Sequence, residues 1–116
     1  MANPVCHFEI GCRDLERSSE FYSKLFDWQI NRQESSGWIR TGESIGGHLK
    51  QIGDDQQNYL TVYFAVDDVQ AYLDRAVALG GKVVMPVINI LSGQCSWFAD
   101  PEGNVIGLFK ETADTA

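Results

Sequence analysis

The sequence lacks an excess of positive charge, a long apolar segment and a regular set of cysteines. Nine Lys and Arg against 16 Asp and Glu give a net charge of −7, so we expect no binding to nucleic acid or to an anionic membrane surface. No apolar run approaches the roughly 20 residues that cross a membrane, and the first residues lack the basic and apolar regions of a signal peptide. Cys6, Cys12 and Cys95 are an odd number without metal-ligand spacing. Together these absences predict a cytoplasmic protein with reduced thiols.

The residues that are present predict a single domain over 1–116, because 44% of the chain is hydrophobic and only three residues are proline. Alternation of apolar and polar residues marks strands, and apolar residues at helical spacing mark two helices. The expected elements, in chain order, are a strand at 5–12, a helix at about 14–26, strands at 28–31, 37–41, 44–52 and 60–66, a helix at 67–79, a strand at 82–86 and a hairpin within 94–110. In the hairpin turn, Pro101 fixes φ and Gly103 supplies a left-handed residue.

The two halves of the chain repeat each other when the first is shifted by 54 positions. The superposed pairs include His7 with Thr61, Ile10 with Phe64, Asp14 with Asp68, and Leu25 with Leu79. Module one covers about residues 5–53 and module two about residues 58–111, with the polar segment 53–58 between them. The sequence therefore predicts an α+β fold of two β-α-β-β-β modules related by pseudo-twofold symmetry, forming a curved mixed sheet around a cup.

One face of the predicted sheet is too polar to be ordinary core. His7 and Glu9 point to this face from the first strand of module one, and Thr61 and Tyr63 point to it from the corresponding strand of module two. A polar concave face of this kind is typical of a small-molecule site.

The last strand of each module adds to this face. Once about five residues are allowed for loops, the repeat aligns His48 with Gly107, although a register slip of one residue would turn His48 to the opposite face. Gly107 has no side chain and is expected to leave open space. Trp38 and Trp97 either supply aromatic surface to an amphipathic ligand or pack as ordinary core.

The chain resembles the vicinal oxygen chelate superfamily, which includes glyoxalase I, extradiol dioxygenases and bleomycin-resistance proteins. The resemblance covers about residues 5–110. It is carried by His7-Phe8-Glu9-Ile10, Asp14-Leu15-Glu16-Arg17-Ser18, Phe21-Tyr22, Phe64-Ala65-Val66-Asp67-Asp68-Val69 and Asp100-Pro101-Glu102-Gly103-Asn104-Val105-Ile106. It implies the two-module fold strongly and the function only weakly, since one fold hosts several activities.

The resemblance also implies where a metal would be held, because metal-dependent members take His, Gln or Glu ligands from the first and last strands of each module. The matching positions here are His7, His48, Thr61 and Gly107. Thr61 is a poor metal ligand, and Gly107 has no side chain that could bind a metal. Two protein ligands therefore remain where a catalytic zinc site has three. This departure predicts a domain that uses no cofactor and binds a small molecule. The expected lining residues are His7, Glu9, Trp38, His48, Thr61, Tyr63, Trp97 and Gly107.

Two other hypotheses remain open. In one, a divalent metal (Zn, Ni, Fe or Mn) bound by His7 and His48 supports glyoxalase-like lyase or isomerase chemistry, with Glu9 as catalytic base or third ligand. Two residues of strand separate Glu9 from His7 by roughly 6.5–7 Å, which disfavours a shared metal. Glu9 is otherwise expected to pair with Arg13, Arg40 or another base. In the other hypothesis, the chain is purely an interaction module.

By the same resemblance, the chain is expected to form a homodimer, since small members of the superfamily usually dimerise. The apolar residues Val87, Ile88, Ile90 and Leu91 are candidates for exposed surface, in a segment too irregular to assign. The expected partners are thus a small-molecule ligand and a second copy of the chain.

Overall fold

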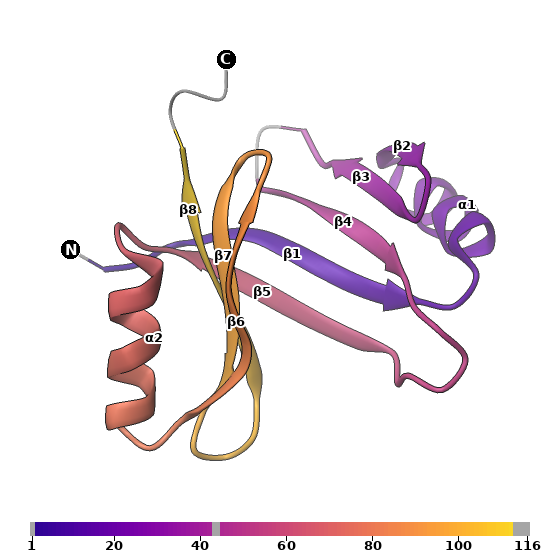
Figure 1. Ribbon diagram of the computed structural model, residues 1–116. Helices are drawn as coiled ribbons and strands as arrows, with labels where there is room; N and C mark the ends of the chain where they lie inside the picture. Colours follow the sequence, from indigo (N-terminus) through magenta and orange to yellow (C-terminus); the bar gives the residue numbers. More distant parts are fainter. Residues whose placement is uncertain (1, 43–44, 113–116) are drawn as a thin grey trace. The chain divides into compact units, whose positions relative to one another are not determined.

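The computed structural model describes residues 2–42 and 45–112 and contains two helices and eight strands (Figure 1). In chain order the elements are β1 (Val5–Cys12), α1 (Leu15–Phe26), β2 (Gln29–Gln33), β3 (Ser36–Arg40), β4 (Gly46–Gln51), β5 (Tyr59–Ala65), α2 (Val69–Ala78), β6 (Lys82–Ile90), β7 (Gly93–Ala99) and β8 (Val105–Glu111). The predicted α+β fold of two β-α-β-β-β modules is confirmed.

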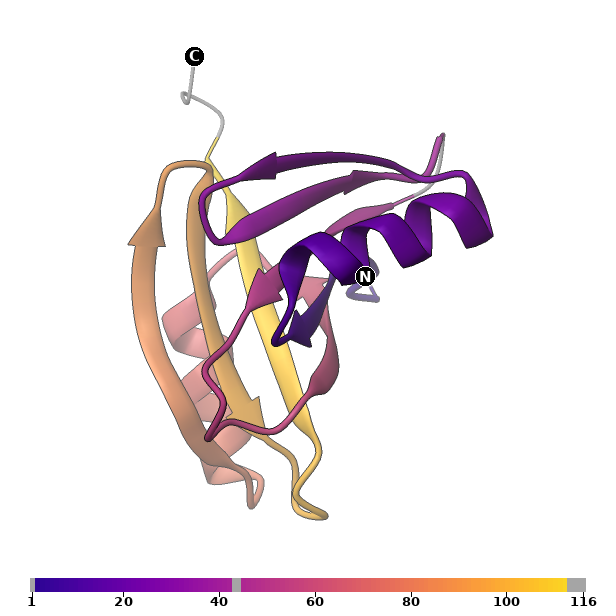
Figure 2. The ribbon, with the colours of Figure 1, turned by 90° about the vertical axis from the view of Figure 1, so that its right-hand side faces the viewer.

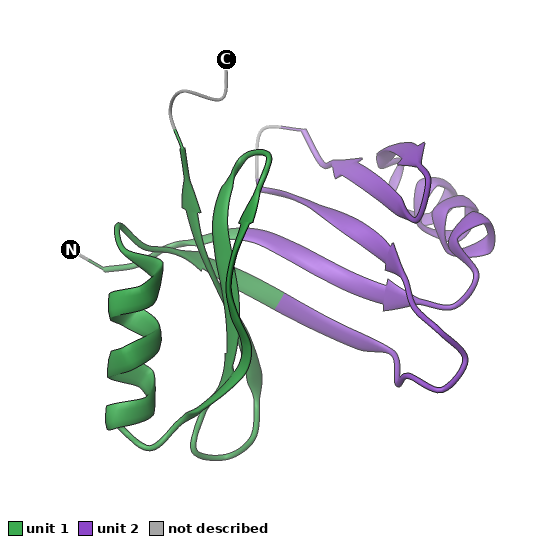
Figure 3. Ribbon diagram, in the orientation of Figure 1, with its two compact units in different colours: residues 1–6, 62–116 green, residues 7–61 purple. Residues whose placement is uncertain are grey.

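The strands hydrogen-bond in the order β2-β3-β4-β1-β5-β8-β7-β6. The pairs β1–β4 and β5–β8 are parallel, and β2–β3, β3–β4, β6–β7 and β7–β8 are antiparallel. The chain divides into two compact units, one of residues 7–61 and one of the described residues within 1–6 and 62–116 (Figure 3). We call them unit 2 and unit 1 as in that figure. None of the helices in residues 2–42 and 45–112 is long and apolar enough to span a bilayer.

In unit 2, helix α1 covers the apolar face of its strands (Figure 2). The helix begins because the Asp14 carboxylate accepts a hydrogen bond from the backbone N–H of Arg17 at 3.0 Å, and it ends at Asp27 in the left-handed region. The buried core consists of Cys12, Leu15, Ile39 and Leu49, with Phe8, Ile10, Tyr22, Trp28 and Ile30 packed against it. Because strand side chains alternate, the residues between these core positions, including His7 and Glu9, point to the opposite face.

Unit 1 repeats the arrangement with α2 packed on β6, β7 and β8. Asp68 caps α2 by accepting from the N–H of Ala71 at 3.0 Å, and the core consists of Val66, Val69, Leu73 and Leu108. The β7–β8 turn is closed by the Asp100 carboxylate, which accepts hydrogen bonds from the Asn104 backbone and side chain. Gly103 has φ +95°, the left-handed conformation that its position predicts.

Strand β6 is longer than the expected strand at 82–86 and includes the segment that the sequence left unassigned. Its pairing with β7 shifts register between Val83 and Met85 and again between Met85 and Ile88. These irregularities explain why the alternation is hard to read from the sequence. Strand β6 ends the strand order, in agreement with the edge position that Pro86 favours. The expected strand at 44–52 starts at Gly46 in the structure, and Ser44 lies outside the described residues.

Candidate functional site

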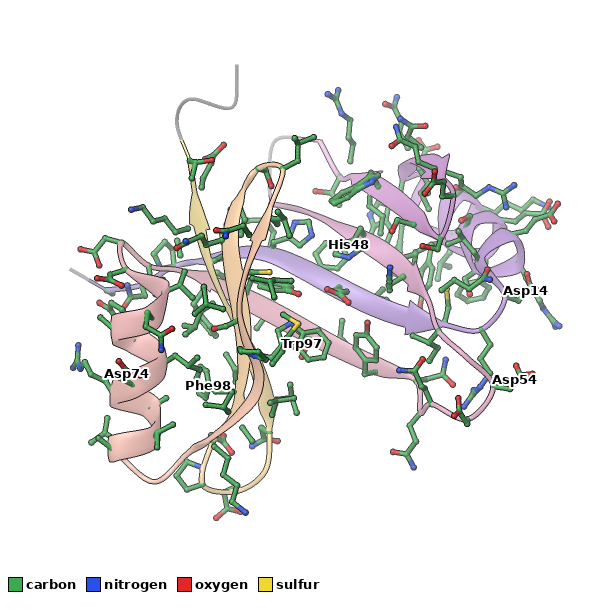
Figure 4. The ribbon with its side chains drawn as sticks, in the orientation of Figure 1. Asp14, His48, Asp54, Asp74, Trp97 and Phe98 are labelled. Carbon is green, nitrogen blue, oxygen red and sulfur yellow. The ribbon has the colours of Figure 1, made fainter. Side chains whose placement is uncertain are left out.

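The polar face of unit 2 is organised by a row of three residues on adjacent strands. Trp38 on β3 is the register partner of His48 on β4, and His48 is the register partner of Glu9 on β1 (Figure 4 marks His48). Residues that are directly opposite in register point to the same face of a sheet. The structure therefore places His48 on the face of His7 and Glu9.

The two histidines contact each other directly. Nε2 of His7 lies 2.7 Å from Nδ1 of His48, within hydrogen-bond distance. The ring of Trp38 is tilted against that of His48, with the centroids 4.7 Å apart, and its centroid lies 6.0 Å from that of the His7 ring. Trp38 is 44% exposed, which makes it the solvent-facing side of this aromatic group.

Glu9 is the buried member of this group, with only 6% of its surface exposed. Its Oε1 lies 3.3 Å from Nε2 of His48, and its Oε2 accepts a hydrogen bond from the hydroxyl of Tyr59. Among the expected bases, His48 lies beside Glu9, whereas Arg13 donates to the side chain of Asn58 and the carbonyl of Gln56. A buried carboxylate needs such partners, because an unpaired buried charge is costly.

Burial and neighbouring charges shift the pKa values at this site. Burial and, to a smaller extent, the electrostatic effect of His48 lower the pKa of His7 to about 4, while Glu9 acts in the opposite direction. Burial together with the hydrogen bond to Glu9 raises the pKa of Tyr59 well above its usual range. At neutral pH His7 is therefore uncharged, and Tyr59 remains a hydrogen-bond donor to Glu9.

Tyr59 reaches Glu9 because Gly11 leaves room for its ring. A Cβ atom on Gly11 would overlap the ring of Tyr59. Neither residue was among those expected to form the site. Two signals were available: residues 59, 61 and 63 share one strand face, and Gly11 shares a face with His7 and Glu9.

The corresponding row in unit 1 has a different chemistry. Gly107 on β8 is the register partner of both Tyr63 on β5 and Trp97 on β7. The ring of Tyr63 lies where a Cβ atom on Gly107 would be, and the indole N–H of Trp97 donates to the Tyr63 hydroxyl at 2.7 Å. The expectation that Gly107 leaves open space was wrong, because Tyr63 fills it. Thr61, the remaining expected position, lies in unit 2 and is buried.

The residues of unit 2 do not fit the metal site that the superfamily resemblance implies. Both ring nitrogens of His48 already face protein groups, Nδ1 toward His7 and Nε2 toward Glu9, so its lone pair is not directed at a shared point with His7. Among the residues that the structure describes, no group of three or more His, Cys, Asp or Glu is arranged to hold a metal ion. The arrangement instead joins a phenol to an acid and one imidazole to another by hydrogen-bond contacts, with the acid and the second imidazole 3.3 Å apart.

A hollow in unit 1 is apolar and is lined by none of these residues. It has a volume of about 290 Å³ and lies between α2 and the β7–β8 turn, lined by Tyr72, Leu79, Phe98, Pro101 and Leu108 among others. Arg75 and Asp100 are its charged members, and they are not part of a cluster of acid–base groups. We therefore take the polar row of unit 2 as the candidate site.

The two β-α-β-β-β modules and their strand order are those of the vicinal oxygen chelate superfamily, to which this protein belongs. Within it, the chain is a member of the glyoxalase-like domain family, whose sequence model matches residues 7–109.

Curated relatives of this chain include a protein of antibiotic biosynthesis. The anthracycline biosynthesis protein DnrV of Streptomyces peucetius is 29% identical over 125 residues, which cover 90% of this chain and 46% of DnrV. This chain thus spans about half the length of the curated relatives that it matches first.

Two solved structures share the fold. The methylmalonyl-CoA epimerase of Mycobacterium tuberculosis aligns with a TM-score of 0.70 at 15% identity, covering 93% of this chain and 87% of the epimerase. A Mn(II)-bound glyoxalase of Novosphingobium aromaticivorans aligns with a TM-score of 0.67 at 17% identity, covering 94% of this chain and 40% of the glyoxalase. At these identities the likeness concerns the fold alone.

Proposed function

We propose that this glyoxalase-like domain binds a planar small molecule on the polar face of unit 2, with Trp38 as the stacking surface and the His7–His48 pair as the hydrogen-bonding group. The incomplete ligand set, with Thr61 and Gly107 at two ligand positions, supports binding without a metal. The domain would act as a binding protein, or as the binding part of a longer protein.

The observation that carries the proposal is the exposed indole of Trp38, which lies beside the ring of His48 at a tilt of 33°. The indole is 44% exposed, so part of it faces solvent, while another part lies against the polar side chain of His48. Small-molecule sites combine apolar surface with a few placed polar groups in this way. His48 and Glu9 are fixed by their mutual contact, so little ordering is needed when a ligand arrives.

A planar aromatic ketone is the ligand class that suits this surface. Its ring would stack on Trp38 and its carbonyl oxygen would accept a hydrogen bond from the imidazole pair. DnrV is named for anthracycline biosynthesis, and anthracyclines are polycyclic aromatic ketones, which supports this choice.

A matched pair of probes tests the proposal: 9-fluorenone and fluorene have the same planar rings and differ by one carbonyl oxygen. We expect fluorenone to bind more tightly, by tryptophan fluorescence quenching, and the binding to be lost in Trp38→Leu. Trp28→Leu is the control, because Trp28 packs in the core with Phe8 and Tyr22 away from the polar row. Equal affinity for both probes, or unchanged binding in Trp38→Leu, would contradict the proposal.

The alternative function is that of a divalent-metal-dependent glyoxalase-like lyase or isomerase, with His7 and His48 as ligands and Glu9 as base. We retain this alternative because the two imidazoles lie side by side, with Nε2 of His7 2.7 Å from Nδ1 of His48. Titration of the protein with Zn²⁺, Ni²⁺, Mn²⁺ or Fe²⁺ decides between the two. Stoichiometric, tight binding that is lost in His7→Ala would favour the metalloenzyme.

We also propose that the protein forms a homodimer through the outer apolar residues of β6 and the turn after it. Ile88, Ile90 and Leu91 are all exposed, whereas Val87 packs against the core of unit 1. An exposed apolar strand at the end of a sheet is a surface that proteins usually cover.

A further inference from the structure

We propose that the apolar hollow of unit 1 is a second ligand site, which takes a small aromatic carboxylate. The rings of Tyr72 and Phe98 lie beside the apolar body of this ligand, and the guanidinium of Arg75 pairs with its carboxylate. The site shares no residue with the polar row of unit 2. It gives the domain a ligand in addition to the one proposed for the face of Trp38.

The hollow is bounded by α2 on one side and by β7, β8 and their turn on the other. The apolar side chains of its wall are Tyr72, Ala76, Leu79, Phe98, Pro101 and Leu108. Phe98, labelled in Figure 4, packs against the core of unit 1. Leu108 is buried, whereas Leu79 is exposed, so the hollow runs from the core to the surface. A wall of this composition is stabilised when hydrocarbon covers it.

Two small residues contribute to the open space. A Cβ atom on Gly81 would lie 2.6 Å from the carbonyl oxygen of Ala99, so the path of the backbone requires glycine there. Ala76 lines the hollow from the third turn of α2, and a larger side chain at this position would enter it. The space is therefore adjustable by substitution at one position, which provides a test.

The backbone at the end of α2 has its hydrogen bonds closed within the chain. The carbonyls of Arg75, Ala76 and Val77 accept hydrogen bonds of 2.8–3.1 Å from the N–H groups of residues 79–81. Carbonyls at the end of a helix otherwise need a polar partner from outside the helix. Recognition of a polar group on the ligand is therefore left to the side chains around the hollow.

The two charged residues of the hollow differ in their existing contacts. Both carboxylate oxygens of Asp100 accept hydrogen bonds within the β7–β8 turn, from the N–H groups of Glu102 and Asn104 and from the Asn104 amide. The guanidinium of Arg75 lies over the ring of Tyr72, 5.4 Å from its centroid. Within residues 2–42 and 45–112, no carboxylate forms an ion pair with Arg75. Charge complementarity therefore favours an anionic group, and a carboxylate matches the planar donors of arginine.

The volume of the hollow sets the size of the ligand. It is about 290 Å³, near the lower end of the range for small-molecule sites. A water molecule takes about 30 Å³ of the liquid, so the hollow holds about ten non-hydrogen atoms, or two fused aromatic rings. The rings of Tyr72 and Phe98 favour an aromatic body over an aliphatic one. Because Arg75 is exposed, the carboxylate stays at the surface.

Methyl NMR of the full chain, titrated with 2-naphthoate, tests the site. The matched probe is 2-naphthamide, which has the same rings and no charge. We expect a Kd of about 1 mM for naphthoate and a Kd about threefold to fivefold higher for the amide, the ratio for a partly exposed ion pair. Methyl signals of Ala76, Leu79 and Leu108 should shift, whereas those of Ile39 and Leu49, in the core of unit 2, should stay.

The charge is tested by Arg75→Gln, which should weaken naphthoate binding about threefold to fivefold and leave binding of the amide unchanged. Lys82→Gln is the control, because it removes the same charge from an exposed residue of β6 that does not line the hollow. It should change neither affinity. Equal affinity of the wild type for the two probes, or unchanged naphthoate binding in Arg75→Gln, would overturn the proposal.

The location is tested by Ala76→Phe, which places a ring in the hollow and should abolish binding of both probes. Ala78→Phe is the control, because Ala78 is exposed on the same helix and does not line the hollow. It should leave both affinities unchanged. Should Ala76→Phe fail to fold, Ala76→Leu should weaken both probes by filling part of the space. Binding that survives both substitutions at position 76 would overturn the proposal.

Trp38→Leu separates this site from the proposed function. It should abolish binding of 9-fluorenone and leave the Kd for naphthoate unchanged, whereas Ala76→Phe should leave fluorenone quenching intact. Loss of naphthoate binding in Trp38→Leu would place that probe on the polar row and overturn the site in unit 1. The absence of any methyl shift at several millimolar naphthoate would also overturn it, whatever the result with fluorenone.

Discussion

The ring of Tyr63 lies directly over Gly107, in the place where a Cβ atom at that position would be. In the sequence repeat, Tyr63 is the counterpart of Glu9 and Gly107 that of His48. One pair of strands thus carries a carboxylate and an imidazole, and the other carries a phenol ring on a glycine. The space for a ligating side chain at Gly107 is filled from the neighbouring strand.

This contact predicts a strong cost for adding one methyl group. Gly107→Ala should lower the free energy of unfolding by about 1–3 kcal/mol, the usual cost of overpacking. Urea unfolding of Gly107→Ala, Tyr63→Ala and the double variant measures the coupling. We expect Gly107→Ala to cost clearly less in the Tyr63→Ala background; simple additivity would show that the ring is not what the methyl group meets.

The low pKa of His7 predicts that stability falls on acidification. The unfolded chain takes up a proton at His7 near its ordinary pKa of 6.5, whereas the folded chain does so only at about 4. Between these values the unfolded state binds more protons, so the free energy of unfolding decreases as the pH falls from about 6.5 to 4. Urea unfolding across this range should show a shallower dependence in His7→Gln than in the wild type. The same slope in both would contradict the shift.

The raised pKa of Tyr59 predicts the opposite dependence at high pH. A folded pKa above the unfolded value of 10.0 gives stability that is present below pH 10 and is lost as the pH rises above it. The chain has four tyrosines, and absorbance titration should show one that ionises last, with unfolding. That late step should vanish in Tyr59→Phe and persist in Tyr63→Phe.

The two helix caps predict a matched pair of stability losses. Asp14 and Asp68 each accept one hydrogen bond at 3.0 Å from the backbone N–H three residues later. Asp14→Ala and Asp68→Ala should each lower the free energy of unfolding by about 1 kcal/mol. Asn substitutions, which retain the acceptor, should recover most of the loss. A smaller effect of Ala than of Asn at either site would argue against capping.

The exposed apolar residues of β6 predict a dimer that charge would disrupt. Sedimentation at micromolar concentration should show a dimer for the wild type and a monomer for a variant with both Ile88→Lys and Ile90→Lys. Leu60→Lys is the control, because Leu60 is even more exposed but lies on β5. A wild type that sediments only as a monomer would refute the interface, as would a dimer that survives the double substitution.

The sequence determined the fold of this protein to a large degree. Local signals sufficed for the helices, since Asp14 and Asp68 are capping residues before regular apolar stripes. The internal repeat then gave a second line of evidence for the elements of each module. The prediction for β6 was too short, because two register shifts break the alternation on which strand assignment depends.

The tertiary structure decided the chemistry of the site. Periodicity placed His7 and Glu9 on one strand face, but it left the register of His48 open, because a shift by one residue reverses a side chain. Only strand pairing brings Glu9, His48 and Trp38 into one row. Tyr59 joins that row from 50 positions away, and the glycine that admits it has no side chain to signal a role. Gly107, whose missing side chain suggested an empty place, is covered by Tyr63, because what occupies the space beside a glycine is set by its neighbours in the fold.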